Sequence, residues 1–145
     1  DNLEGFLFPD TYEFPVGISG QDIGKIMRAN FDKKTVGLKI TTEMVIMASI
    51  IEKEVQTPTD KALVSGILWK RINIGMPLQV DAERWTYANR GLPLEPIANP
   101  GLESIKAAIY PKDSPYWFYL SAPDGKTIFS RSLAEHNLAR AKYLQ

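Results

Sequence analysis

The sequence predicts an α+β fold, in which several helices pack with a small antiparallel β-sheet and a long loop stays ordered. Residues 44–51 are apolar on nearly every side, which is typical of a buried helix. Two strand-like runs flank the turn at residues 123–125, which indicates a β-hairpin. Residues 75–101 contain prolines and no helical period, yet enough apolar side chains to predict an ordered loop.

Side chains that cap helix ends place the other helices. The expected helices, with their capping signals in parentheses, are 21–33 (Ser19), an apolar helix to about Val55 (Thr41 or Thr42), a helix from Pro58 that stops at Gly75 (Thr57), a short helix to Ile109 (Asn99 with Pro100) and a final helix (Ser132 with Glu135). The strands are expected at 116–121 and 126–130, and residues 3–15 in extended and turn structure. No repeat or linker interrupts this series, which predicts one domain over residues 1–145.

The composition is typical of a globular domain that can bury a core, since 44% of the 145 residues are hydrophobic. Seventeen basic residues balance seventeen acidic ones without a basic stripe, so we expect no nucleic-acid partner. The lack of cysteine excludes disulfides and thiol catalysis. No run approaches the ~20 apolar residues that cross a bilayer, so we expect the chain itself to be soluble. It begins at Asp1 rather than Met, which predicts a fragment of a longer protein.

Glu54 is the first candidate for chemistry because it follows the apolar helix at its C-terminal end. The last-turn carbonyl groups carry partial negative charge, which disfavours a carboxylate and favours a protonated carboxyl group. Burial raises a carboxyl pKa in the same direction. A carboxyl group that is protonated near neutral pH can act as a general acid. A solvated carboxylate at a fraying helix end remains the alternative.

Other ionisable residues have structural interpretations. Glu52 points elsewhere on the helix than Glu54, at ~100° per residue, and is expected to pair with a cation or face solvent. Glu43 suits the dipole in the first turn of the same helix. His136 is the only histidine, and without cysteine or a second histidine we expect no metal and no cofactor. A serine triad lacks its G-x-S-x-G motif, so His136 is interpreted as an ordinary helix residue.

The long loop carries residues that suit a sugar ligand. Gln79 and Asp81 lie two apart, so in an extended segment they would project to one side. Trp85 and Tyr87 follow, and aromatic faces stack on sugar rings while amides bond the hydroxyl groups. The alternative is that the two aromatic residues attach the loop to the core and Asp81 caps a turn. Asn99 is expected to be a helix cap first and a ligand contact second.

Four long segments carry a resemblance to a known family. They are LEGFLFPDTY at 3–12, ASIIEKE at 48–54, RINIGMPLQVD at 71–81, and GLP with PIANPG at 91–101, followed by the tail EHN at 135–137. In this order and over nearly the whole chain, they resemble the endolytic murein transglycosylases, also called MltG or YceG-like proteins. The resemblance makes the long loop an active-site loop and the chain a single catalytic domain.

The resemblance implies a lytic transglycosylase that cleaves the β-1,4 bond between N-acetylmuramic acid and N-acetylglucosamine in peptidoglycan. The product would be a 1,6-anhydro-muramic end. The second glutamate of EKE, Glu54, would be the catalytic residue. The substrate-binding residues expected with it are Gln79, Asp81, Tyr87, Asn99 and Tyr12.

The resemblance also implies partners and a location. Peptidoglycan glycan strands would be the substrate, and cell-wall synthases such as penicillin-binding proteins are candidate partners. Family members are usually held by an N-terminal membrane helix and carry a LysM-like subdomain, and both would lie upstream of residues 1–145. We therefore expect the bacterial cell envelope, at the outer face of the cytoplasmic membrane, periplasmic or extracellular.

The chain departs from the family pattern in the long loop. The family commonly has threonine two residues after the loop aspartate, where this chain has Glu83. It also usually has a longer insertion that ends in Asn-Thr-Tyr, which is shortened here to Trp85-Thr86-Tyr87.

Two alternatives to the lytic reaction follow from the residues: a hydrolase in which Asp81 activates water opposite Glu54, and a glycan-binding module without catalysis.

Overall fold

The computed structural model describes residues 2–144 and has an α+β fold, as the sequence predicts. Within this range the elements are α1 (Gly20–Lys34), α2 (Thr42–Glu54), α3 (Pro58–Asn73), α4 (Trp85–Ala88), α5 (Leu102–Ile109), β1 (Phe118–Ser121), β2 (Thr127–Ser130) and α6 (Leu133–Tyr143). No helix of the described range has both the length and the hydropathy needed to span a bilayer.

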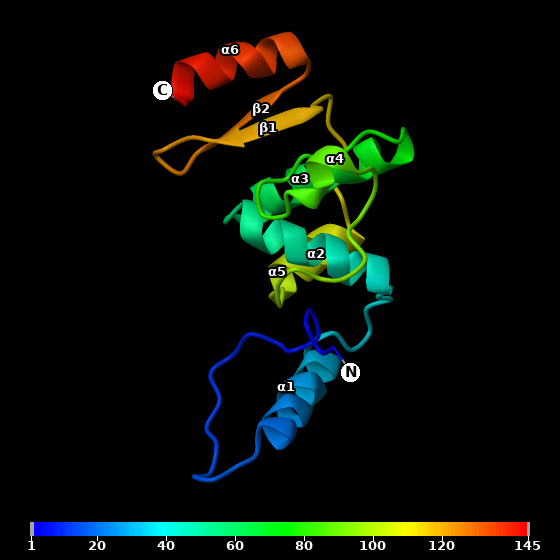
Figure 1. Cartoon of the computed structure of the whole chain (residues 1–145), viewed down its shortest axis with the longest axis vertical. Coiled ribbons are helices and arrows are strands. Elements are labelled where there is room, and N and C mark those ends of the chain that lie inside the picture. Colours follow the sequence, from blue (N-terminus) through cyan, green and yellow to red (C-terminus); the bar gives the residue numbers. More distant parts are fainter. Residues whose placement is uncertain (1, 145) are drawn as a thin grey trace.

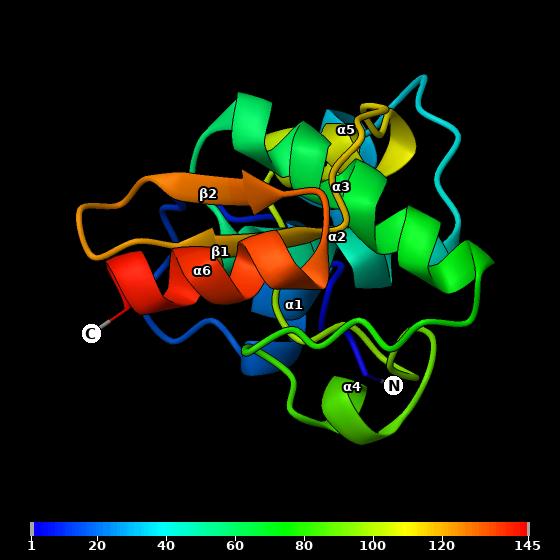
Figure 2. The same ribbon diagram turned by 90° about the horizontal axis from the view of Figure 1, so that it is seen from above.

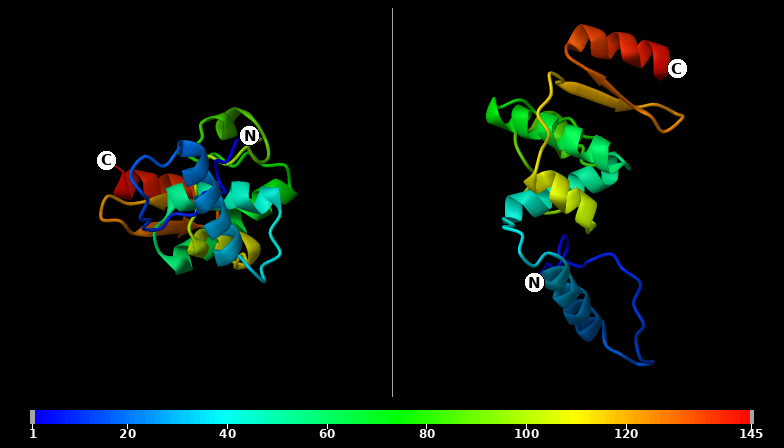
Figure 3. Two further views of the ribbon diagram at one scale, coloured as in Figure 1. Left: turned by 90° about the horizontal axis from the view of Figure 1, so that it is seen from below. Right: turned by 180° about the vertical axis from the view of Figure 1, so that it is seen from behind.

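The elements form three parts along the longest axis of the molecule (Figure 1). Helix α1 and the extended N-terminal segment lie at one end, α2, α3 and α5 in the middle, and the hairpin with α6 at the other end. The view from behind shows the same order (Figure 3). From above, α6 lies along the hairpin (Figure 2), and it packs against both strands.

Helix α2 forms the centre of the core because it is apolar around its whole circumference. Met47, Ile50 and Ile51 have no exposed surface, and the helix packs mainly against α5 and α3. Thr41 caps its first turn, with its hydroxyl group accepting a hydrogen bond from the amide of Met44 at 3.2 Å. A helix buried on all sides has a fixed direction, and this direction determines where its last residue, Glu54, points.

Most of the predicted caps are confirmed. Ser19, Thr57 and Ser132 each accept a hydrogen bond from the amide three residues later, at 3.1, 3.2 and 3.2 Å. The box at Ser132 is modified, since the carboxylate of Glu135 accepts from the amide of Arg131 at 2.9 Å. Gly75 follows α3 with a φ of 72°, a left-handed conformation that suits a helix stop.

The predicted cap of the short helix is wrong. Helix α5 begins at Leu102, and Gly101 rather than Asn99 is its capping residue. The side chain of Asn99 instead accepts hydrogen bonds from the amides of Gly5 and Leu7, at 2.7 and 3.2 Å. The physical reason is a long-range contact: the N-terminal segment lies beside residue 99 and supplies two amide groups that no local element satisfies.

The hairpin and the long loop differ from the sequence prediction. The hairpin strands are shorter than expected, four residues each, with Tyr119 opposite Phe129. The long loop is ordered, as predicted, but contains a helical turn, α4, that its composition did not indicate. Buried Thr86 fixes this turn, because its hydroxyl group bonds the carbonyl of Glu83 at 2.6 Å and the amide of Val80 at 3.0 Å.

Gly66 of α3 lies against the chain that leads to the hairpin, where a side chain has no room. A Cβ atom at residue 66 would lie 2.0 Å from the carbonyl oxygen of Lys112. We expect Gly66→Ala to lower the free energy of unfolding by about 1–3 kcal/mol, because the backbone must move to relieve the clash. Thermal unfolding measures this change. Gly20→Ala is the matched control, since nothing lies within 4 Å of its Cβ position, and equal stability of both variants would contradict the packing described.

Candidate active site

A cleft of about 400 Å³ lies where α2 ends, between the long loop and the hairpin with α6. Its walls come from α2, α3, the loop, β1 and α6. The lining residues are Glu54, Arg71, Gln79, Asp81, Tyr87, Phe118, Tyr119, Leu120, Ser121, Leu133, His136, Arg140 and Leu144. Four residues that sequence reasoning selected, Glu54, Gln79, Asp81 and Tyr87, thus meet in one cavity.

Glu54 is the last residue of α2 and is half-buried in this cleft. Burial raises the pKa of its carboxyl group above the ordinary value, and the nearby charge of Asp81 acts in the same direction. A hydrogen bond from Tyr119 opposes this shift without cancelling it. The carboxyl group is therefore held in a partly desolvated site and is not a solvated group at a fraying helix end. This arrangement favours the protonated form that proton donation requires.

Tyr119 was not predicted from the sequence, yet its side chain hydrogen-bonds Glu54. Its hydroxyl group donates a hydrogen bond to Oε1 of Glu54 at 2.6 Å. Burial and the charge of Glu54 hold the pKa of Tyr119 well above its usual value, so the hydroxyl group stays a donor. The only signal in the sequence was a tyrosine within a half-buried strand, whose hydroxyl group needs a partner.

Gln79 and Asp81 line the same cleft, but not because their segment is extended. Gln79 has a φ of 54°, in the left-handed region, and Asp81 lies in a turn. Between them, Val80 is fully buried and bonded to Thr86, which fixes the path of the loop. A non-glycine residue in this conformation is uncommon and is found where surrounding contacts determine the backbone.

The two aromatic residues of α4 face different cavities. Tyr87 lines the main cleft and donates a hydrogen bond to a carboxylate oxygen of Asp81. Burial and this bond raise the pKa of Tyr87 to about 12. Trp85 lines a second groove, with residues 93–97. Trp85 and Tyr87 are 41% and 45% exposed. The loop is attached to the core by buried Leu78 and Val80, and not by these two aromatic residues.

Glu52 points away from the cleft and connects α2 to two other helices. Its Oε1 atom accepts a hydrogen bond from the amide of Gly101 at 2.6 Å, at the start of α5. Its Oε2 atom lies 3.5 Å from the ammonium group of Lys61, which is buried and also donates to Ser104 at 2.9 Å. The predicted pairing of Glu52 with a cation is confirmed, and the carboxylate also suits the positive end of α5.

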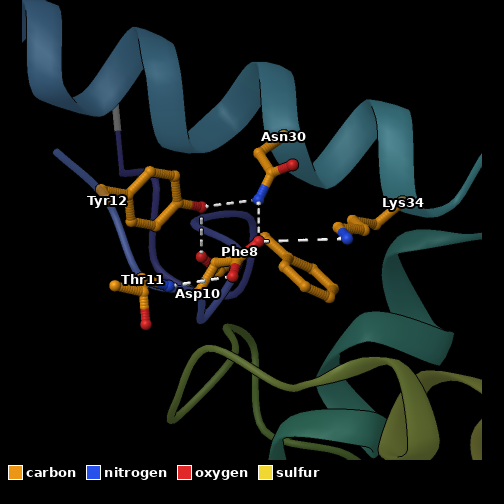
Figure 4. Close-up of polar contacts among 6 residues, drawn as sticks. All are labelled: Phe8, Asp10, Thr11, Tyr12, Asn30 and Lys34. Atoms are coloured by element: carbon orange, nitrogen blue, oxygen red, sulfur yellow. Dashed lines mark hydrogen bonds and ion pairs between the residues drawn. The ribbon is translucent and has the colours of Figure 1, made fainter.

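Tyr12 and Asn99 do not line the cleft. In Figure 4, Tyr12 lies under α1, where it donates to the carbonyl of Phe8 at 2.6 Å and accepts from Asn30 at 2.9 Å. Asn30 also bonds Asp10 at 3.0 Å, which ties the N-terminal segment to the helix. Asn99 holds the amides of Gly5 and Leu7. A substrate contact by Tyr12 or Asn99 stays a prediction and would require the ligand to extend beyond the cleft.

Comparison with known proteins identifies the family. The model of the YceG-like family matches residues 1–84 and 85–142, which is nearly the entire chain. This chain belongs to the YceG-like family. A yceG-like protein of Listeria monocytogenes has the same fold in its crystal structure, with a TM-score of 0.84 and 31% identity, over 94% of this chain and 55% of that one.

Two named relatives extend the comparison. An endolytic murein transglycosylase of Bacillus subtilis is 31% identical over 98% of this chain, and one of Streptococcus pneumoniae is 26% identical over 98%. The chain spans 48% and 32% of the length of these two proteins. The Bacillus alignment extends over 176 residues, more than the 145 of this chain, and the family match is interrupted between residues 84 and 85. Both findings agree with a shortened loop before Trp85.

The burial of Glu54 predicts a pH-dependent effect of Glu54→Gln on stability. Because the pKa of Glu54 is higher in the folded than in the unfolded protein, wild-type stability falls as the pH rises through the unfolded value towards the folded one. Glutamine keeps the hydrogen bond with Tyr119 but cannot ionise. We expect Glu54→Gln to be more stable than wild type at pH 7. The difference should be about 1.4 kcal/mol for each tenfold difference in the proton affinity of Glu54 between the folded and the unfolded protein. It should vanish near pH 4, where the carboxyl group is protonated in the folded wild type.

Denaturant unfolding at both pH values measures this difference. Glu13→Gln is the control, since Glu13 is exposed in the N-terminal segment and its replacement should change stability little at either pH. A Glu54→Gln variant that is less stable than wild type at pH 7 would contradict the desolvation of this carboxyl group.

Proposed function

We propose that this domain is an endolytic peptidoglycan lytic transglycosylase that cleaves the β-1,4 bond between N-acetylmuramic acid and N-acetylglucosamine. The observation that carries the proposal is the half-buried carboxyl group of Glu54, whose pKa is raised inside a cleft of about 400 Å³. The names of the Bacillus and Streptococcus relatives support the substrate class. The location that follows is the bacterial cell envelope, at the outer face of the cytoplasmic membrane.

Glu54 acts twice in the proposed reaction. Its protonated carboxyl group first gives its proton to the glycosidic oxygen while the bond to C1 of the muramic ring breaks, and positive charge develops at C1. The carboxylate then takes the proton of the C6 hydroxyl group, and O6 closes the 1,6-anhydro ring on C1. Water is not consumed, and Glu54 regains its proton for the next cycle.

Neighbouring residues assist these two steps. Tyr119 donates to Oε1 of Glu54 in both states, which orients the acid and stabilises the carboxylate that forms. Gln79 and Tyr87 line the cleft and are proposed to hold the glycan strand. Asp81 accepts a hydrogen bond from Tyr87 and is proposed to stabilise the positive centre at C1.

Hydrolysis is the second candidate because a second carboxyl group lies in the same cleft. Asp81 is close enough to Glu54 for its charge to affect the pKa of that residue. Inverting glycosidases use such a pair, with one carboxylate activating water opposite the acid. In this structure the carboxylate of Asp81 accepts a hydrogen bond from Tyr87, which occupies one of its oxygens. The products distinguish the two reactions.

Mass spectrometry of peptidoglycan digested with this domain tests the proposal. We expect anhydro-muramic ends from wild type and a loss of about 10²–10⁴-fold in rate for Glu54→Gln, the usual contribution of general acid–base catalysis. Asp81→Asn should still give anhydro ends, at a lower rate. Reducing ends would establish hydrolysis, with Asp81 as the base. Strand binding without any product, equal in wild type and Glu54→Gln, would establish a binding module.

A further inference from the structure

Helix α6 and its C-cap residue, Leu144, present one stripe of side chains to the cleft. Leu133, His136, Arg140 and Leu144 follow one another at intervals of three and four residues, the spacing of a single helix face. All four line the same cavity as Glu54. The proposed reaction uses none of them, although they form a whole wall of the cleft.

The cleft lining contains two cations, Arg71 of α3 and Arg140 of α6. The guanidinium group of Arg71 is buried and already donates to the carbonyl groups of Leu78 at 2.5 Å and Trp117 at 2.7 and 3.1 Å. Arg140 is exposed and forms no ion pair with another residue in the range 2–144. Arg71 is thus occupied by the fold, whereas the donors of Arg140 remain available to a ligand.

His136 lines the cleft together with the two cations, Arg71 and Arg140. Its ring stacks on Phe118 with the centroids 5.2 Å apart. Burial lowers the pKa of His136, and the charges of Arg140 and Arg71 lower it further. Glu54 and Asp81 line other walls of the same cavity. The cleft is therefore polarised, with carboxyl groups from α2 and the loop and cations from α3 and α6.

We propose that Arg140 binds a carboxylate carried by the 3-O-substituent of the muramic residue, and so selects strands by that substituent. This inference rests on the proposed function. A glycan of N-acetylglucosamine alone has no anionic group, whereas every muramic residue carries a lactyl ether that ends either in a free carboxylate or in a peptide with carboxylates. A planar guanidinium group is suited to such a ligand. The second groove offers no such site, since its ionisable lining residues, Glu83 and Glu95, are both acidic.

The carboxylate has two possible sources, and two substrates separate them. Intact strands carry the peptide, so their lactyl group is an amide and the carboxylates available to Arg140 are those of the peptide. Strands treated with an amidase have lost the peptide and carry the free lactyl carboxylate. An effect of Arg140 on intact strands alone assigns the peptide carboxylate, and an effect on treated strands alone assigns the lactyl carboxylate.

Kinetics of Arg140→Gln on both substrates test the proposal. We expect KM to rise about tenfold on the strand type that carries the bound carboxylate, with little change in kcat, since a charge-assisted contact to the substrate alone is removed. Arg131→Gln removes the same charge from an exposed residue outside the cleft lining and should leave KM unchanged. Equal KM values for wild type and Arg140→Gln on both substrates would overturn the inference.

A binding measurement decides the same question without turnover. His136 is the only histidine, so its NMR titration is unambiguous in the Glu54→Gln protein. The muramic tetrasaccharide that carries the bound carboxylate, either the intact or the amidase-treated form, should raise the pKa of His136, because its carboxylate offsets the charge of Arg140. The chitin tetrasaccharide should not, nor should any ligand after Arg140→Gln is added. An identical titration with all ligands would overturn the inference, whereas a response here without cleavage by wild type would reject only the proposed reaction.

Discussion

The last turn of α2 sends two carboxyl groups to different sides of a helix that is otherwise buried, and the site depends on this division. Glu52 accepts a hydrogen bond from the amide of Gly101 and lies beside Lys61. The first of these contacts fixes the start of α5 against α2. Glu54 accepts a hydrogen bond from the hydroxyl group of Tyr119, and this bond fixes the hairpin against the same helix end. Glu52 thus pairs with a cation on another side of the helix, whereas Glu54 forms no ion pair with a residue in the range 2–144.

In the proposed reaction one carboxyl group serves as acid and base, and its surroundings support both roles. A carboxyl group with a raised pKa is less stable as an anion than it would be in water, and the tyrosine bond limits this penalty in the ionised state. The buried circumference of α2 supplies the rigidity, because a helix packed on all sides cannot rotate to expose its last residue. The rest of the cleft, from the loop and from α6, encloses this group.

Local signals in the sequence predicted much of the fold and part of the site. Ser19, Thr57 and Ser132 cap helices as predicted because a cap depends on residues three positions apart. Glu54 could be selected because burial and the helix end are both visible in a short run of residues. These arguments need no knowledge of the tertiary structure, and they held where the contacts are local.

Contacts between residues far apart in the chain determine the features that could not be predicted from the sequence. Tyr119 meets Glu54 across 65 positions of the chain, and Asn99 meets Gly5 across 94. The cap assigned to Asn99 was wrong because its local pattern was the same whether or not the N-terminal segment lay beside it. Gln79 reached the cleft through a left-handed backbone held by Thr86, not through the extended segment that the spacing suggested.

A carbon-13 NMR titration of the carboxyl group of Glu54, assigned by comparison with Glu54→Gln, tests the central claim most directly. The account predicts a pKa above that of an ordinary glutamate in the wild-type domain. It also predicts a further rise in Tyr119→Phe, which loses the one side-chain bond that lowers this pKa. Tyr116→Phe, in the segment before β1 and outside the cleft lining, should leave the value unchanged. A pKa at or below the ordinary value would contradict the account, since Glu54 would then be a carboxylate at neutral pH with no proton to donate.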